Sequence, residues 1–218
     1  QTFSTKPSLL LHACCGPCSL EPVRVFSEEG VELALDYSNP NIHPRKEYER
    51  RLSTIRDSVA DPNGIELFEG EYDPDEWERR VGIHGTDREA RCRACYRMRL
   101  ERAAKRAHEE GFDALCTTLT ISPYQYTGII LEELERAARA AGLAPVCRDF
   151  REYYPEATRR SRAKGMYRQN YCGCRFSIAE AQAERKARAS AQKARSAAKH
   201  LALLWAAAEG AVNQASQL

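Results

Sequence analysis

The chain has 218 residues, with 33 Lys or Arg, 31 Asp or Glu and a formal net charge of +2. This length suits one main domain, with or without an appendage, and is sufficient to bury a sizeable core. No stretch reaches the ~18 apolar residues of a membrane span, and the N-terminal apolar run is too short for a signal peptide. We therefore expect a cytoplasmic protein with no membrane partner.

The charges are distributed unevenly. Residues 1–147 contain 19 Lys or Arg against 25 Asp or Glu, whereas residues 148–218 contain 14 against 6. The second part is basic enough to attract a polyanion, although many of these charges could equally lie on solvated helix faces.

Strand and helix patterns alternate along the chain. Apolar strands are expected at 8–13, 31–38, 64–72, 114–120 and 144–150, with helices at 22–30, 44–60, 91–111 and 126–142. This order predicts an α/β fold, a Rossmann-like parallel sheet with helices on both faces. From about residue 178 the sequence is rich in Ala, Lys, Arg and Gln. We expect an α/β metalloenzyme domain at 1–177 and a C-terminal helical extension at 178–218.

Ligands of such sheets bind at the carboxyl ends of the strands. The residues expected to emerge there are Cys14, Cys15, Cys18, Asn39, Thr117 and Thr118. The first three come from LLLHACCGPCS, which brings three thiols together directly after the first strand.

Nine cysteines in a reducing compartment favour metal binding or catalysis over disulfides. RCRAC holds Cys92 and Cys95 at the spacing of a metal-binding pair, and YCGC holds Cys172 and Cys174 around a glycine. With the opening trio these make seven thiols, three more than one structural zinc site needs. Four thiolates on an iron-sulfur cluster, with three left for a second metal or for redox chemistry, fit the number better. The other two, Cys116 and Cys147, lie in apolar strand patterns and are expected to be buried core thiols.

Six segments together resemble one family. They are LLHACCGPCS, YSNPNIHPRKEYERR, RCRACYRMRL, CTTLTISPYQ, DFRE and YRQNYCGCRFS. In order and spacing they resemble the cobalamin-independent epoxyqueuosine reductases (QueH), which complete queuosine at the wobble position of certain tRNAs. The resemblance covers roughly residues 8–177. Gln125 departs from it, since Lys is common at this position.

The resemblance implies a 4Fe-4S cluster beside a separately coordinated mononuclear iron, and conversion of an epoxide to an alkene with loss of water. It also implies the anticodon loop of tRNA as partner and an electron donor such as a ferredoxin or flavodoxin. Because consecutive strand residues point in opposite directions, we expect Cys14 and Cys15 to serve different metals. The expected cluster ligands are Cys14, Cys92, Cys95 and Cys174, and the expected iron ligands are Cys15, Cys18 and Cys172.

Further polar residues are candidates for catalysis or substrate binding. His12 could donate a proton or a hydrogen bond to a ligating sulfur, or be a core histidine, and Cys18 is the second catalytic candidate. The substrate-binding candidates are Asn39, Asn41, His43, Thr117, Thr118, Tyr124, Tyr167, Arg168 and Gln169. Loop architecture could equally explain the first three, and core packing the tyrosines. Phosphate contacts are expected from Arg159, Arg160, Arg162 and Arg168.

Two other functions are compatible with parts of the pattern. An ATP-dependent tRNA-thiolating enzyme would need a Gly-Ser-rich phosphate loop after the first strand, where this chain has thiols. A non-catalytic zinc and RNA-binding module would not need seven clustered cysteines.

Overall fold

The computed structural model describes residues 8–215, and side chains as far as residue 200. Residues 1–7 of the expected domain and residues 216–218 of the expected extension lie outside this range. The chain separates into a domain that ends at Cys174 and a second unit that begins at Arg175.

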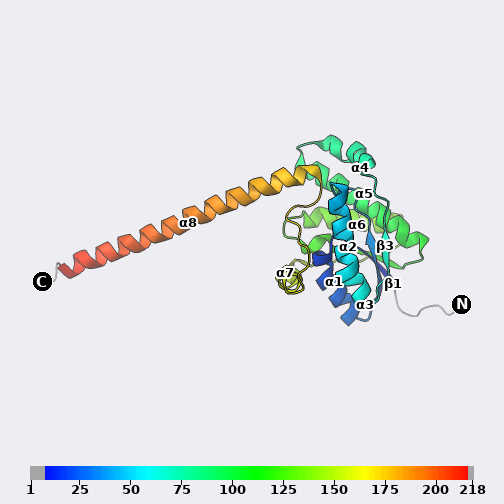
Figure 1. The fold of residues 1–218 in the computed structure, drawn as a ribbon, viewed down its shortest axis with the longest axis horizontal. Coiled ribbons are helices and arrows are strands. Elements are labelled where there is room, and N and C mark those ends of the chain that lie inside the picture. The colour runs from blue at the N-terminus through cyan, green and yellow to red at the C-terminus, as the bar shows by residue number, and fades with distance from the viewer. Residues whose placement is uncertain (1–7, 216–218) are drawn as a thin grey trace. The chain divides into compact units, whose positions relative to one another are not determined.

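The domain is built on a five-stranded parallel sheet, which confirms the predicted α/β class (Figure 1). The strands are β1 (Ser8–His12), β2 (Glu32–Tyr37), β3 (Leu67–Glu69), β4 (Ala114–Thr117) and β5 (Ala144–Pro145). Their spatial order is β3-β2-β1-β4-β5. The order reverses between β1 and β4, so the ends of these two strands form the switch point at which such folds bind ligands.

Helices cover both faces of the sheet. They are α1 (Gly16–Glu28), α2 (Arg45–Ile55), α3 (Asp61–Asn63), α4 (Pro74–Arg80), α5 (Arg88–Glu109), α6 (Thr127–Ala140) and α7 (Tyr154–Ala163). A π-helical turn, Arg56–Ala60, joins α2 to α3, and 3-10 turns lie at Gly82–His84, Thr118–Ile121 and Arg151–Tyr153.

The two faces have separate apolar cores because strand side chains alternate. Leu9 and Leu11 of β1 pack with residues of α1, α2 and α7. Leu10 faces the other side and packs with α5 and α6. The site between β1 and β4 is therefore held by buried layers on both sides.

Several boundaries differ from the sequence-based expectation. Helix α1 begins at Gly16 rather than at residue 22, because Cys15 is its extended N-cap and Pro17 suits a first turn. Strand β5 ends at Pro145, so the expected strand to residue 150 is too long. As a result Cys147 is exposed, and the expectation of a buried thiol is wrong there, whereas Cys116 of β4 is fully buried.

The second unit is the helix α8 (Arg175–Ala215), which confirms the expected C-terminal helix. Its side chains from residue 185 to residue 200 are all exposed. Among the described residues, no helix combines the length and the apolar character needed to cross a membrane.

Candidate metal centre

The cysteines after β1 form a compact trio. The Sγ atoms of Cys14, Cys15 and Cys18 all lie within 4.8 Å of one another, and Cys14 Sγ is 3.8 Å from Cys15 Sγ. Strand β1 ends at His12, before the first of these cysteines. Strand alternation therefore does not separate Cys14 from Cys15, and Cys18 joins them from the first turn of α1.

The trio shares charge through hydrogen bonds. Hydrogen bonds from Cys14 and Cys18 hold the pKa of the Cys15 thiol well below its ordinary value. The same contact with Cys15 raises the pKa of Cys14 to about 11, and contacts with Cys14 and Cys15 raise the pKa of Cys18. Of the three thiols, Cys15 therefore ionises first.

A second group consists of Cys92 and Cys95 on α5 and Cys172 and Cys174 near the end of the domain. Burial first, and then the charges of Cys172, Cys95 and Cys174, raise the pKa of Cys92 to about 12. Burial likewise raises the pKa of Cys95 to about 11. Cys172 and Cys174 thus act electrostatically on both cysteines of α5.

The segment that carries Cys172 and Cys174 is fixed by a buried arginine. Arg51 is 2 % exposed, and its Nη1 and Nη2 donate to the carbonyls of Cys172 at 2.7 Å and Tyr171 at 3.3 Å. Glu47 pairs with Arg51 at 2.7 Å. Gly173 has a φ of 143°, and a Cβ there would approach Ile42 Cγ1 at 3.0 Å. Glycine is therefore required by the backbone conformation and by the close packing.

Arg99 of α5 connects the two cysteine groups. Its side chain is 1 % exposed, and it donates a short hydrogen bond to Asn39 Oδ1. Burial would lower the pKa of this guanidinium, but the charges of Cys95, Cys14 and Cys172 raise it. Within residues 8–200 no carboxylate forms an ion pair with Arg99. Buried positive charge of this kind favours the anionic form of neighbouring thiols, which is the form that binds metal.

His12, Thr117 and Thr118 lie at the ends of β1 and β4, as predicted. His12 is fully buried, with Nδ1 2.9 Å from Thr117 Oγ1. Burial, followed by the charge of Arg99, lowers the pKa of His12 to about 3. Thr118 Oγ1 accepts from the Cys14 backbone N–H at 3.2 Å and lies 3.6 Å from Cys14 Sγ.

The loop after β2 lies against the same site. Asn39 Nδ2 donates to the Ala13 carbonyl at 2.9 Å, so Asn39 holds the start of the cysteine loop. Asn41 is 1 % exposed, and its Oδ1 has no hydrogen-bond partner among the described residues. The His43 backbone N–H donates to the Gly173 carbonyl at 2.9 Å. These contacts join the loop to both cysteine groups.

The remaining substrate-binding candidates are more dispersed. Gln169 hydrogen-bonds to Cys15 and helps to lower the pKa of that thiol. Tyr167 donates to both carboxylate oxygens of Glu47, and Arg168 donates to the Thr158 carbonyl at 2.9 Å. Tyr124 is 46 % exposed.

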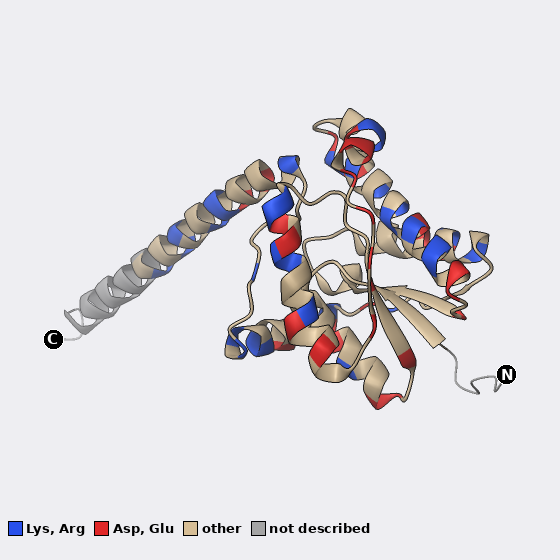
Figure 2. Cartoon of the chain, turned by 45° about the vertical axis from the view of Figure 1, so that its right-hand side comes forward, with Lys and Arg blue, Asp and Glu red and all other residues tan. Residues whose placement is uncertain are grey.

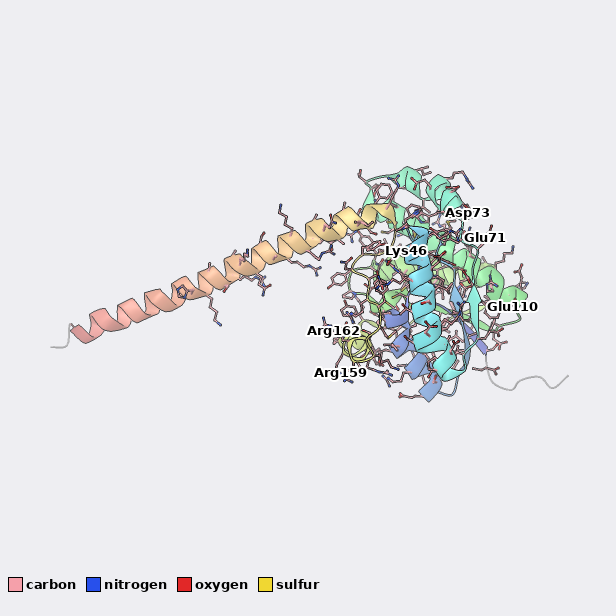
Figure 3. All side chains as sticks on the ribbon, in the orientation of Figure 1. Lys46, Glu71, Asp73, Glu110, Arg159 and Arg162 are labelled. Atoms are coloured by element: carbon pink, nitrogen blue, oxygen red, sulfur yellow. The ribbon has the colours of Figure 1, made fainter. Side chains whose placement is uncertain are left out.

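The basic residues of α7 are largely ion-paired. Arg159 pairs with Glu156 at 2.6 Å, and Arg160 pairs with the buried Glu21 at 2.6 Å. Arg159 and Arg162 are exposed on α7 (Figure 3).

Sequence reasoning did not identify the buried groups that surround the thiols. Arg51 and Arg99 lie on helices in which most arginines are exposed or half-buried, and nothing in the local pattern distinguishes them. The Trp77 indole N–H donates to Cys95 Sγ at 3.3 Å. Trp77 lies on α4, a helix that was not predicted. At the unusual Gln125, the side-chain oxygen accepts from the Tyr96 hydroxyl at 2.5 Å.

The donor set fits thiolate-bound metal. A tetrahedral ion with metal–sulfur distances of about 2.3 Å places its ligands about 3.8 Å apart, close to the separation of Cys14 and Cys15. Soft thiolates select zinc or iron-sulfur centres. Fold and site together define a class, an α/β protein with a cysteine-rich site at the switch point of its sheet.

Comparison with known proteins narrows this class. The family model described as epoxyqueuosine reductase QueH matches residues 9–180. A protein of Dehalococcoides mccartyi named epoxyqueuosine reductase QueH is 33% identical over 172 residues, covering 78% of this chain and 92% of the relative. Proteins of the same name from Acinetobacter baylyi and Thermotoga maritima are 36% and 34% identical over 180 residues each. These alignments cover 78% and 79% of this chain, and 80% and 91% of the respective relatives.

The chain therefore belongs to the epoxyqueuosine reductase QueH family, and the resemblance seen in the sequence is confirmed.

Proposed function

We propose that the chain reduces epoxyqueuosine in the anticodon loop of tRNA to queuosine. The observation that carries this proposal is the trio of thiols within 4.8 Å of one another at the switch-point edge of a chain that belongs to the QueH family. Because tRNA is the substrate, we expect the reaction to occur in the cytoplasm.

The reaction requires a balanced supply of electrons and protons. The epoxide takes up two electrons and two protons, both of its carbon–oxygen bonds break, an alkene forms, and the oxygen leaves as water. A protein donor of the ferredoxin or flavodoxin type would provide the electrons. When bound, a 4Fe-4S cluster would supply electrons one at a time, and a separate iron would supply Lewis acidity for the epoxide oxygen.

We assign the ligands by the two thiol groups. Cys92, Cys95, Cys172 and Cys174 would hold the cluster, and Cys14, Cys15 and Cys18 would hold the single iron. This differs from the partition expected from the sequence, which rested on strand alternation beyond the end of β1. The grouping of the trio within 4.8 Å supports the new assignment.

The surrounding residues would position these ligands and the substrate. Arg99 and Arg51 provide buried positive charge beside the thiolates, and Trp77 donates to Cys95. His12, uncharged at neutral pH, would act through its hydrogen bond to Thr117 rather than as an imidazolium acid. Asn41, with an unpartnered buried oxygen, is the first candidate for contact with the substrate, and Gln169 would adjust the charge of the trio.

Conversion of an epoxyqueuosine-containing tRNA tests the activity. Anaerobically prepared protein with a chemical one-electron reductant should convert the modified nucleoside to a product lighter by one oxygen atom, detected by mass spectrometry after digestion. No conversion by protein that contains both iron and sulfide would reject the proposed reaction.

A further inference from the structure

The helix α8 carries a long run of positively charged residues. From Arg185 to Ala208 the sequence contains six Lys or Arg residues and no Asp or Glu. All side chains from 185 to 200 are exposed. Lys and Arg recur along this part of α8, whereas acidic residues are interspersed with them on the helices of the domain (Figure 2).

On the helices of the domain many basic residues are ion-paired. On α5, Arg93 pairs with Glu132 at 2.7 Å and Arg97 pairs with Glu133 at 2.9 Å. On α8, in contrast, no acidic residue stands three or four positions from Lys186, Lys193, Arg195 or Lys199. Helical ion pairs form at those spacings, so these four side chains have no acidic partner within the helix.

The charges of α8 share one side of the helix. At 3.6 residues per turn, the six basic residues fall within about half of the circumference, and Lys186 lies about 20 Å from Lys199 along the axis. The opposite side between 185 and 200 carries only Ala and Ser. The Ala, Lys, Arg and Gln residues of this segment favour helix, so the charges are presented on a preformed element.

This distribution of side chains indicates whether the helix binds an anionic membrane or RNA. A helix that lies on an anionic membrane needs large apolar side chains opposite its charges. Opposite the six basic residues α8 carries only Ala and Ser, and the large apolar residues Leu201, Leu203, Leu204 and Trp205 come after the last of these charges. RNA needs only the charges, because phosphate contacts are electrostatic and independent of sequence.

We propose that the basic side of α8 binds the phosphate backbone of the substrate tRNA and makes no contact with the reacting nucleoside. This inference rests on the proposed function for the identity of the RNA. The family match ends at residue 180, so the basic run lies outside the part of the chain shared with the family model. Helix α8 would add binding energy for whole tRNA without taking part in the reduction.

Two charge-matched variants of the full-length holoenzyme test this. The first replaces Lys193, Arg195 and Lys199 of α8 with Gln, which preserves helix propensity. The control replaces Arg79, Lys105 and Arg139 with Gln, three exposed basic residues on α4, α5 and α6. Binding of an unmodified tRNA transcript is measured by fluorescence anisotropy over a series of salt concentrations.

The α8 variant should bind tRNA more weakly, and its slope of log K against log salt should be shallower by about 2, since each lost phosphate contact removes about 0.7 to 0.9. The control should keep the wild-type slope. Equal slopes in the α8 variant and wild type would overturn the proposal.

Two further measurements, of activity on a stem-loop and of binding to vesicles, distinguish failure of this proposal from failure of the proposed function. With an epoxyqueuosine-containing anticodon stem-loop, the α8 variant should keep the wild-type kcat, while KM for whole tRNA rises. If wild-type protein fails to reduce the stem-loop, the proposed function fails, but the transcript-binding comparison still decides the role of α8. Loss of binding to vesicles of three parts phosphatidylcholine and one part phosphatidylserine, with an unchanged tRNA slope, would assign the helix to a membrane surface instead.

Discussion

At the scale of single residues, the site contains buried arginines as well as cysteines. The cysteines could be found from the sequence because their spacing is distinctive. The compensating cations could not, because an arginine such as Arg99 looks like any charged residue of an amphipathic helix. Its burial depends on the packing of α5 against the sheet, which no local pattern reports.

The assignment of ligands to two metals can be tested at Cys14. In anaerobically prepared protein, Cys14→Ala should lose about one iron but keep its inorganic sulfide and the cluster absorption, because the trio holds only the single iron. Cys92→Ala should lose the sulfide, and the control Cys116→Ala, outside both groups, should lose neither. Iron and sulfide assays joined to an optical spectrum give the answer. Loss of sulfide from Cys14→Ala equal to that from Cys92→Ala would restore the partition based on strand alternation.

Arg99 should control the reduction potential of the centre. Replacing it with Gln removes a buried cation beside Cys95 and Cys14, so the reduced, more negative state loses stabilisation. We expect a midpoint lower by on the order of 60 mV, equivalent to about tenfold in a one-electron equilibrium. A potentiometric titration followed by absorbance measures this. Arg97→Gln, on the same helix but 47% exposed, is the control and should leave the midpoint potential unchanged. An equal shift in both variants would contradict the proposed effect of Arg99 on the potential.

At the scale of elements, ion pairs join α5 to α6, and the buried one is formed by Glu133. Glu133 of α6 is 2 % exposed and lies 2.9 Å from both Arg97 and Arg136. Burial alone would raise its pKa, but hydrogen bonds from Arg97 and Arg136 outweigh burial and lower the pKa to about 2. Because α5 carries Cys92 and Cys95, this contact also stabilises the position of two proposed ligands.

Glu133→Gln should therefore lower the free energy of unfolding by about 1–2 kcal/mol at pH 7.5, after allowance for half-exposed partners. A lowered pKa stabilises the fold above the ordinary glutamate pKa of about 4.3. The difference from wild type should thus stay constant from pH 8 to pH 5.5 and narrow as the pH falls toward the folded-state pKa. Thermal unfolding of wild type and Glu133→Gln over this pH range measures the difference in stability. Glu135→Gln, 50% exposed on the same helix, is the control and should change little; an equal loss in both would argue against the buried contact.

The sequence predicted the elements with strong apolar patterns better than the others. Strands β1 and β4 and the helix α5 lie close to where they were expected, although the strand expected at 114–120 ends at Thr117 and continues as a 3-10 turn. The helices α4 and α7 have few buried residues, so their patterns carry little signal. The two-residue strand β5 depends on its pairing with β4 and on Pro145, which the apolar run through residue 150 does not reveal.

At the scale of the whole molecule, the chain order explains why distant cysteines can cooperate. Strand β1 lies between β2 and β4, so the loops that follow it and β4 meet at one edge, as Cys14 and Thr118 do. The α/β alternation predicted this edge, and with it the trio, from sequence alone. Cys172 and Cys174 were expected at the same site from their spacing and from the family resemblance. The contacts that hold them, such as those of Arg51 with the carbonyls of 171 and 172, could not be predicted.

The central claim is that this edge holds a four-iron cluster and one further iron, and the most direct test is the ratio of iron to inorganic sulfide in anaerobically prepared protein. Seven thiols divided into groups of four and three predict brown protein with about five iron atoms and four sulfides per chain. Protein that remains colourless after anaerobic reconstitution with iron and sulfide, and that binds zinc alone, would contradict the account.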